Sequence, residues 1–280
     1  MTGNDRTTDL LIGNPMVFRD MPLEDALRKM VDLGFDALEL WPPQIEACRT
    51  EALCRQLVEF IDSLGLKALR LNVADRPYFQ SLQPDMDDQS IVDGLKGDID
   101  LAAALGMPQL LTWEGRRPNG LGHHDQYGWL LDRTAGIFEQ AVAYGRTRNV
   151  ELSVEVHPFT LGMDLDWIIA LCDRIHGSDF GIAYDCCHFA VGLPEDYIHA
   201  IHRLGKRIKH VHFCDSDKVS SELHFAPGTG CLDLEGIVEA LKTIGFEGTV
   251  MLDLWLYPLP ELGSRMGVPY TRKVMARLGL

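Results

Sequence analysis

The chain has 280 residues, of which 46% are apolar and 24% are charged, and its net charge is −15. This size and composition fit one large soluble domain, and α/β barrels often have this length. The negative charge disfavours a nucleic-acid partner, because phosphates would be repelled. No apolar run is long enough to cross a bilayer, and the first residues lack the apolar core of a signal peptide. We therefore expect no membrane partner.

The seven cysteines are scattered, and no C-x-x-C pair occurs among them. This pattern favours free thiols in a reducing cytoplasm over a disulfide scaffold or a zinc ribbon. We interpret Cys186 and Cys187 as small buried thiols that pack under the site, although their place beside Asp185 also suggests a nucleophile.

Short apolar runs alternate with helical patterns along the whole chain, in eight units. The expected strands are Leu11–Val17 or part of it, Ala37–Trp41, Ala68–Val73, Gln109–Trp113, Glu151–Val156, Gly181–Tyr184, Ile208–Phe213 and Thr249–Leu254. The expected helices are Pro22–Leu33, Thr50–Leu64, Asp88–Leu105, Gln126–Thr147, Leu165–Ile175, Glu195–Leu204, Leu234–Ile244 and Thr271–Leu278. Glycine directly follows several of these helices, which is typical of helix ends.

The expected strands are continuously apolar, as a sheet buried on both faces requires. Strand and helix alternate in units of about 25 to 40 residues, which favours parallel pairing. Eight such units can close into a (β/α)₈ TIM barrel, and we predict one barrel domain over residues 1–280. An open doubly wound sheet is the alternative, but no G-x-G-x-x-G follows the first strand, so a dinucleotide site has no support.

Four strong metal-ligating side chains come at the ends of the last four expected strands. They are Glu155, Asp185, His212 and Asp253. Barrel enzymes build their sites at these strand ends, so we expect the four side chains to meet. Three buried carboxylates would repel one another without a cation. Their mixture with one imidazole suits one divalent metal ion, with Mn²⁺ as the first choice and Mg²⁺, Co²⁺, Fe²⁺ or Zn²⁺ as alternatives.

Such a metal site predicts chemistry on a small polyol or keto-sugar. Open coordination positions would take a hydroxyl and a carbonyl oxygen on adjacent carbons, and the ion would stabilise the enediolate that forms when a proton is removed. Other polar or aromatic residues near strand ends are candidate substrate contacts, namely Trp113, Glu114, His188 and His224. Glu114 is equally compatible with a helix cap or a surface ion pair. We expect His210 to point away from His212 and to lie under a helix.

These residues lie in segments that resemble the xylose isomerase-like barrel superfamily, in its sugar phosphate isomerase/epimerase group (AP endonuclease family 2 type). The segments are D-A-L-R-K-M-V-D-L-G-F-D-A-L-E-L-W from Asp25, V-E-V-H-P from Val154, Y-D-C-C-H from Tyr184, H-V-H-F-C-D from His210, A-P-G-T-G-C-L-D-L from Ala226 and G-F-E-G-T-V-M-L-D-L from Gly245. The resemblance implies one divalent metal on Glu155, Asp185, His212 and Asp253. It also implies that His188 binds a substrate hydroxyl and that the region of His224 contacts substrate.

One position departs from the epimerases that the chain resembles. Their last ligand is usually a glutamate that works opposite the first one as a second acid/base, whereas this chain has the shorter Asp253. The first prediction is an isomerase or epimerase in which Glu155 or Asp253 removes a proton and the other returns it. The alternative is a lyase that acts by β-elimination, with His157 as the base, because His157 shares a strand face with Glu155.

Two other classes of function are weighed against an enzyme of sugar metabolism. The related DNA-repair endonucleases of this superfamily need extra metal-binding histidines on early strands, where this chain has Glu39 and Asn72. A non-catalytic sugar-binding subunit would keep the barrel without turnover. A homo-oligomer is compatible with the sequence but is not predicted by any one feature.

Overall fold

A closed barrel forms the centre of the molecule. The computed structural model describes residues 7–45, 48, 50–74, 86–118 and 124–280. Within these residues eight parallel strands pair in chain order, and the last strand pairs with the first. The strands are β1 (Leu11–Gly13), β2 (Ala37–Leu40), β3 (Lys67–Asn72), β4 (Gln109–Thr112), β5 (Glu151–Glu155), β6 (Phe180–Asp185), β7 (Ile208–Phe213) and β8 (Thr249–Leu252). The predicted (β/α)₈ fold is confirmed.

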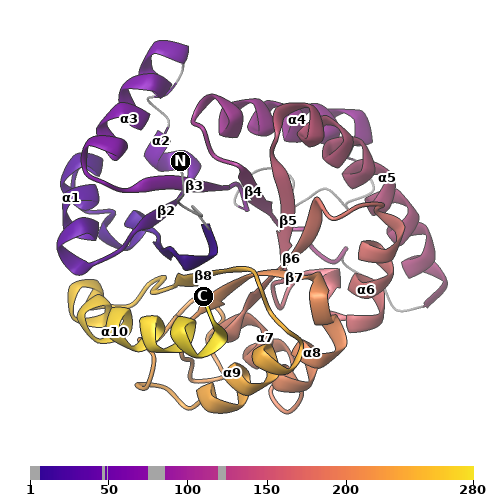
Figure 1. Cartoon of the computed structure of the whole chain (residues 1–280). Helices are drawn as coiled ribbons and strands as arrows, with labels where there is room; N and C mark the ends of the chain where they lie inside the picture. The colour runs from indigo at the N-terminus through magenta and orange to yellow at the C-terminus, as the bar shows by residue number, and fades with distance from the viewer. Residues whose placement is uncertain (1–6, 46–47, 49, 75–85, 119–123) are drawn as a thin grey trace.

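Helices surround the strands as an outer ring (Figure 1). They are α1 (Leu23–Leu33), α3 (Glu51–Ser63), α4 (Asp88–Ala104), α5 (His124–Arg148), α6 (Leu165–Arg174), α8 (Tyr197–Leu204), α9 (Leu234–Thr243) and α10 (Pro260–Leu278). Short helical turns lie in the connections: α2 (Pro42–Ile45), α7 (Cys186–Gly192), η1 (Thr7–Asp9), η2 (Pro15–Phe18), η4 (Leu161–Met163) and η5 (Gly205–Arg207). No helix in the described part of the chain is long and apolar enough to span a bilayer.

Local sequence explains where these helices begin and end. The side chain of Thr50 accepts a hydrogen bond from Leu53 N at the start of α3, and Asp164 does the same for Asp166 N and Trp167 N at the start of α6. Such caps satisfy the free N–H groups of the first turn. Helix α1 ends at Gly34, whose φ of 90° lies in the left-handed region that favours glycine.

The main differences from the prediction are the start of one helix and two short helices. Strand β1 is the first part of the expected segment and stops at Gly13, because Asn14 caps the turn η2 that starts at Pro15. Helix α10 begins at Pro260 rather than at Thr271. Proline suits a first helical turn, but Pro269 interrupts the helical pattern inside the same helix. The short helices α2 and α7 were not predicted.

The barrel interior holds a buried polar group beside an apolar cluster. The apolar cluster is Ile12, Ala37, Leu69 and Met251. The polar group centres on Arg70, whose Nη2 lies 2.7 Å from Thr249 Oγ1 and 2.7 Å from His210 Nδ1. The expectation that His210 lies under a helix is therefore wrong. Residues two apart on a strand share a face, so His210 points inward like His212.

Candidate active site

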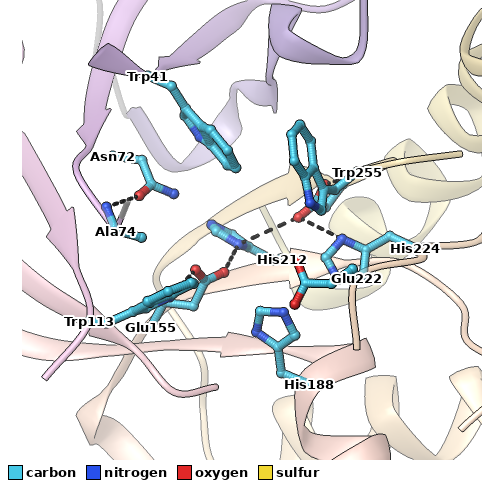
Figure 2. Close-up of a pocket in the computed structure, with 11 residues that line it drawn as sticks. Trp41, Asn72, Ala74, Trp113, Glu155, His188, His212, Glu222, His224 and Trp255 are labelled. Atoms are coloured by element: carbon cyan, nitrogen blue, oxygen red, sulfur yellow. Dashed lines mark hydrogen bonds and ion pairs between the residues drawn. The ribbon is translucent and has the colours of Figure 1, made fainter. Parts of the chain in front are cut away.

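The four predicted metal-ligating side chains converge at the C-terminal end of the barrel. Glu155 and Asp185 end β5 and β6, His212 lies near the end of β7, and Asp253 follows β8 directly. His212 Nδ1 lies 2.6 Å from Glu155 Oε1, 3.7 Å from Asp185 Oδ2 and 3.8 Å from Asp253 Oδ2. All four residues are buried. Figure 2 shows Glu155 and His212 facing one cavity, and Asp253 lines the same cavity.

The donor set fits a divalent cation. Asp185 Oδ2 is buried and makes no hydrogen bond to another described residue. His212 Nδ1 is buried as well, and it forms an ion pair with Glu155 Oε1. Buried polar atoms are almost always paired, so the unpaired carboxylate oxygen that faces this imidazole indicates a missing partner. Ligands at about 2.0–2.2 Å from one ion lie roughly 3–4 Å from one another. The separations of His212 Nδ1 from Asp185 and Asp253 fall in that range.

Ionisation in this cluster also depends on a positive charge at its centre. Burial raises the pKa of Asp185, and the neighbouring Asp253 raises it further. Burial alone would lower the pKa of His212, but Glu39 and Glu155 hold it well above its usual value. The pKa of His224 is likewise held well above its usual value by Asp185 and Asp253, against the effect of burial. Protonated imidazoles therefore supply the positive charge when no cation is bound, and a cation at this place would replace the proton on His212 Nδ1 and leave that imidazole neutral.

His224 lies against two of these carboxylates. Its Nδ1 is 3.2 Å from Asp253 Oδ2, and its Nε2 is 3.7 Å from Asp185 Oδ1. The residue comes from the loop between β7 and α9, where its backbone N–H donates to Trp255 O. The side chain is buried and lines the cavity, so this predicted substrate contact lies within reach of both the carboxylates and a bound molecule.

His188 is positioned by the short helix α7. Asp185 caps this helix, because its Oδ1 accepts a hydrogen bond from His188 N at 2.8 Å. Burial lowers the pKa of His188 to about 3, so its imidazole is neutral at physiological pH. The ring lines the cavity, and its Nδ1 makes no hydrogen bond to a described residue. A neutral imidazole in this position can donate to or accept from a substrate hydroxyl.

His157 pairs with a residue that the sequence did not single out. Its Nε2 lies 2.8 Å from Glu222 Oε1, and its Nδ1 accepts a hydrogen bond from Phe159 N at 3.3 Å. A neutral imidazole with an accepting Nδ1 carries its proton on Nε2 and donates it to Glu222. That hydrogen bond lowers the pKa of Glu222 to about 2. Both ring nitrogens of His157 are thus engaged, and Glu222 is the carboxylate that lines the cavity.

Three tryptophans form the walls of the cavity, which has a volume of about 180 Å³. Trp113 Nε1 donates to Glu155 Oε2 at 2.9 Å and so fixes that carboxylate. The rings of Trp41 and Trp255 lie 4.8 Å apart, on another side of the cavity (Figure 2). Flat apolar walls with a few convergent polar groups are typical of sites for small molecules.

Glu114 occupies a different place from the other predicted site residues. It is buried beside the cavity without lining it, and its Oε1 accepts a hydrogen bond from Gly162 N. Burial raises its pKa to about 7. The structure therefore gives Glu114 a role in holding the loop after β5, and the predicted contact with substrate has no geometric support.

The network beneath the cavity joins Glu39, which the sequence analysis named on an early strand, to Arg70, which it did not. Glu39 Oε2 lies 3.2 Å from His212 Nε2 and accepts a hydrogen bond from Arg70 Nη1 at 2.8 Å. Burial would raise the pKa of Glu39, but His212 and Arg70 lower it to about 2. No local signal marks Arg70, because its partners come from strands that are distant in sequence.

Comparisons with known proteins agree on the family and on the fold. The model of a family described as "Xylose isomerase-like TIM barrel" matches residues 27–274. A putative hydroxypyruvate isomerase from Streptomyces coelicolor is 27% identical over 253 residues, which are 85% of this chain and 87% of the relative. A fructoselysine 3-epimerase from Shigella flexneri is 20% identical over 269 residues, which are 91% and 94% of the two chains.

A solved structure shows the same architecture. The D-psicose 3-epimerase of Clostridium cellulolyticum H10, determined with D-tagatose, superposes with a TM-score of 0.78 at 14% identity. The match covers 95% of this chain and 99% of that one. At this identity the likeness concerns the fold alone.

Proposed function

This chain belongs to the xylose isomerase-like TIM barrel family, and on that premise we propose that it is a divalent-metal-dependent isomerase or epimerase of a small keto-sugar. The observation that carries the proposal is the meeting of three carboxylates and one imidazole at the ends of β5 to β8, with the buried Asp185 Oδ2 left unpaired. The names of the two relatives, an isomerase and an epimerase, support the same class of reaction.

Glu155, Asp185, His212 and Asp253 would hold the ion. Their mixture of oxygen and nitrogen donors suits Mn²⁺ first, and Mg²⁺, Co²⁺, Fe²⁺ and Zn²⁺ remain compatible. When bound, the ion would act as a Lewis acid that polarises the carbonyl of the sugar.

Glu155 and Asp253 are the proposed acid/base pair. In an epimerisation one carboxylate removes the proton from the carbon beside the carbonyl, an enediolate forms, and a carboxylic acid on the other face returns a proton. Trp113 fixes one oxygen of Glu155, and His224 lies 3.2 Å from Asp253 Oδ2. Both carboxylates are therefore held in place before substrate binds. The shorter reach of Asp253 requires the substrate to lie close to β8.

His188, Glu222 and the tryptophan walls would orient the sugar. The neutral His188 can hydrogen-bond a hydroxyl, and Glu222, held by His157, can accept from another. In this arrangement His157 is a positioning residue for Glu222. The elimination reaction that was kept as the alternative needs His157 as a free base, and both of its ring nitrogens are engaged. We therefore do not propose a lyase.

Solvent isotope uptake tests this function. The chain, saturated with Mn²⁺, is incubated in D₂O with a panel of ketoses of three to six carbons, and the products are followed by NMR. We expect one substrate to take up deuterium at the carbon beside its carbonyl as its epimer or aldose isomer appears. A product with new enone absorbance would instead show elimination, and the absence of any exchange would contradict an isomerase.

A pair of matched substitutions on β5 ties the reaction to the site. Glu155→Gln removes the proposed base and should lower the rate by about 10²–10⁴-fold, the usual contribution of a general base. Glu151→Gln makes the same change at the exposed start of the same strand, outside the cavity, and should leave the rate unchanged. Exchange that continues in Glu155→Gln at full metal content would contradict the assignment.

A further inference from the structure

We propose that Glu39 and Arg70 form a buried positioning pair that keeps the Nε2 proton on His212 and thereby leaves Nδ1 free to bind the cation. The inference rests on the cation site proposed above and extends it to residues deeper in the barrel. The side chains of Glu39 and Arg70 are 0% and 1% exposed, and neither lines the cavity. They can therefore act on the reaction only through neighbours that line the cavity, and His212 is the one of these that belongs to the proposed cation site.

The carboxylate of Glu39 is fixed at both oxygens. Oε2 accepts from Arg70 Nη1 at 2.8 Å and lies 3.2 Å from His212 Nε2. Oε1 accepts from Asn72 Nδ2 at 2.8 Å and from Trp41 Nε1 at 3.3 Å. With four donors around it, the carboxylate has a single orientation, in which one lone pair of Oε2 faces the imidazole.

Arg70 is fixed in turn by the strands on either side. Its Nε and Nη2 donate to Gln109 Oε1 at 3.2 and 3.1 Å, and Nη2 also donates to Thr249 Oγ1 at 2.7 Å. These contacts join β3 to β4 and β8 across the barrel interior. A buried ion pair seldom stabilises a protein more than apolar residues of the same volume would. We therefore attribute this pair to a role other than stability.

The purpose follows from the two tautomers of imidazole. A neutral histidine carries one N–H, and its other nitrogen accepts a proton or binds a metal. With the proton on Nε2, His212 donates to Glu39, and the lone pair of Nδ1 faces Glu155, Asp185 and Asp253. With the proton on Nδ1, Nε2 would instead accept from Arg70 Nη1, which lies 3.4 Å away. The ionised Glu39 favours the first tautomer, because only that one offers it a donor.

Glu39→Gln tests the pair directly. The amide of glutamine can turn its NH₂ toward Nε2, which favours the tautomer that blocks Nδ1. We measure the Kd of Mn²⁺ and of Zn²⁺ for the substrate-free protein by competition with an indicator chelator, together with the absorption spectrum of the Co²⁺ form. Loss of a partner behind a metal-binding histidine typically weakens binding by about 10–100-fold, and we expect this loss with an altered Co²⁺ spectrum.

Thr134→Val is the control. It removes a buried hydrogen bond to Leu130 O within α5 and contacts neither member of the pair nor His212. We expect it to lower stability while the Kd of the metal stays within about twofold of wild type. If Glu39→Gln fails to fold, Arg70→Lys replaces it. It is expected to weaken metal binding in the same direction, since an ammonium cannot hold Glu39 and Gln109 together.

The possible results separate the two proposals. Wild-type metal affinity in Glu39→Gln overturns the positioning role, and so does an equal loss of affinity in Thr134→Val, because a general loss of stability would then explain both. A wild-type chain that binds no divalent metal overturns the cation site itself, and with it the proposed function.

Discussion

Asp185 shows how a single residue can serve the fold and the site together. One oxygen of its carboxylate caps α7 by accepting the N–H of His188 at 2.8 Å. The other oxygen faces His212 Nδ1 and makes no hydrogen bond to any residue in the described ranges. The cap therefore places His188 beside the cavity and aims the free oxygen at the cation site. This double role explains why an acid and a histidine lie three residues apart at the end of β6.

Glu114 makes the stability of the protein depend on pH. Its pKa rises from 4.5 to about 7 on folding, mainly because of burial. Between those values the folded state keeps a proton that the unfolded state releases, so the free energy of unfolding falls as pH rises from about 4.5 to 7. Above pH 7 the folded protein carries the full cost of a buried charge. The cost is of the order of 1–3 kcal/mol, given 1.36 kcal/mol per pKa unit.

Glu114→Gln removes this titration while its amide oxygen can still accept from Gly162 N. Urea denaturation of both proteins in EDTA, at pH 5 and pH 8, should show the variant gaining roughly 1–3 kcal/mol on wild type at the higher pH. Glu24→Gln, on the exposed face of α1, serves as the control and should show no such gain. An equal difference between Glu114→Gln and wild type at both pH values would contradict the raised pKa.

The candidate site was only partly predictable from single residues. Glu155, Asp185, His212 and Asp253 stand out because each ends an apolar run, and strand ends of a barrel meet at one face. Glu222 lies in a loop whose sequence has no hydrophobic periodicity. Its proposed role depends on a contact with His157, 65 residues earlier. A loop position of this kind has no signature in the sequence, so it could be found only in the structure.

Among the elements, the first strand of the barrel, β1, is closely packed against its neighbours. A Cβ atom on Gly13 would overlap Met30 Cε and would lie 2.5 and 2.6 Å from the ring of Phe35. Met30 and Phe35 are buried in the main core, so they have little room to move. We expect Gly13→Ala to lower the free energy of unfolding by about 1–3 kcal/mol, the usual cost of overpacking.

Gly97→Ala provides the opposite case for the same substitution. Gly97 lies in α4, and a Cβ there would meet nothing within 4 Å. Replacing a helical glycine with alanine should raise the free energy of unfolding by about 0.5–1 kcal/mol. Urea titrations followed by circular dichroism measure both variants. A Gly13→Ala protein as stable as wild type would contradict the first prediction, because the side chains around β1 would then be able to move aside for the added methyl group.

The elements also show which sequence signals failed and why. The cores of all eight strands were predicted, because buried parallel strands are continuously apolar. The start of α10 was missed, because Gly263, Gly267 and Pro269 weaken its helical pattern. In the structure a Cβ on Gly267 would lie 2.8 Å from Leu252, so this glycine lets α10 approach β8. A tertiary contact thus overrides the local preference.

The proposed metal-ligating residues lie on one half of the ring. Strands β5 to β8 carry Glu155, Asp185, His212 and Asp253, whereas β2 and β3 carry Glu39, Arg70 and Asn72 beneath and beside them. The closed barrel brings the two halves together, and His212 makes the direct link between them through Glu39. The order of the strands alone predicts the first set, but the second requires knowledge of how side chains fill the interior.

The central claim is that four strand-end side chains hold one divalent ion, and calorimetric titration of the chelator-stripped protein tests it most directly. We predict that Mn²⁺ or Zn²⁺ binds at one ion per chain, and that Asp185→Asn weakens binding at least tenfold, whereas Asp173→Asn, which alters only a surface ion pair with Arg207, does not. A wild-type protein that takes up no ion, or an Asp185→Asn variant that binds as tightly as wild type, would contradict the account.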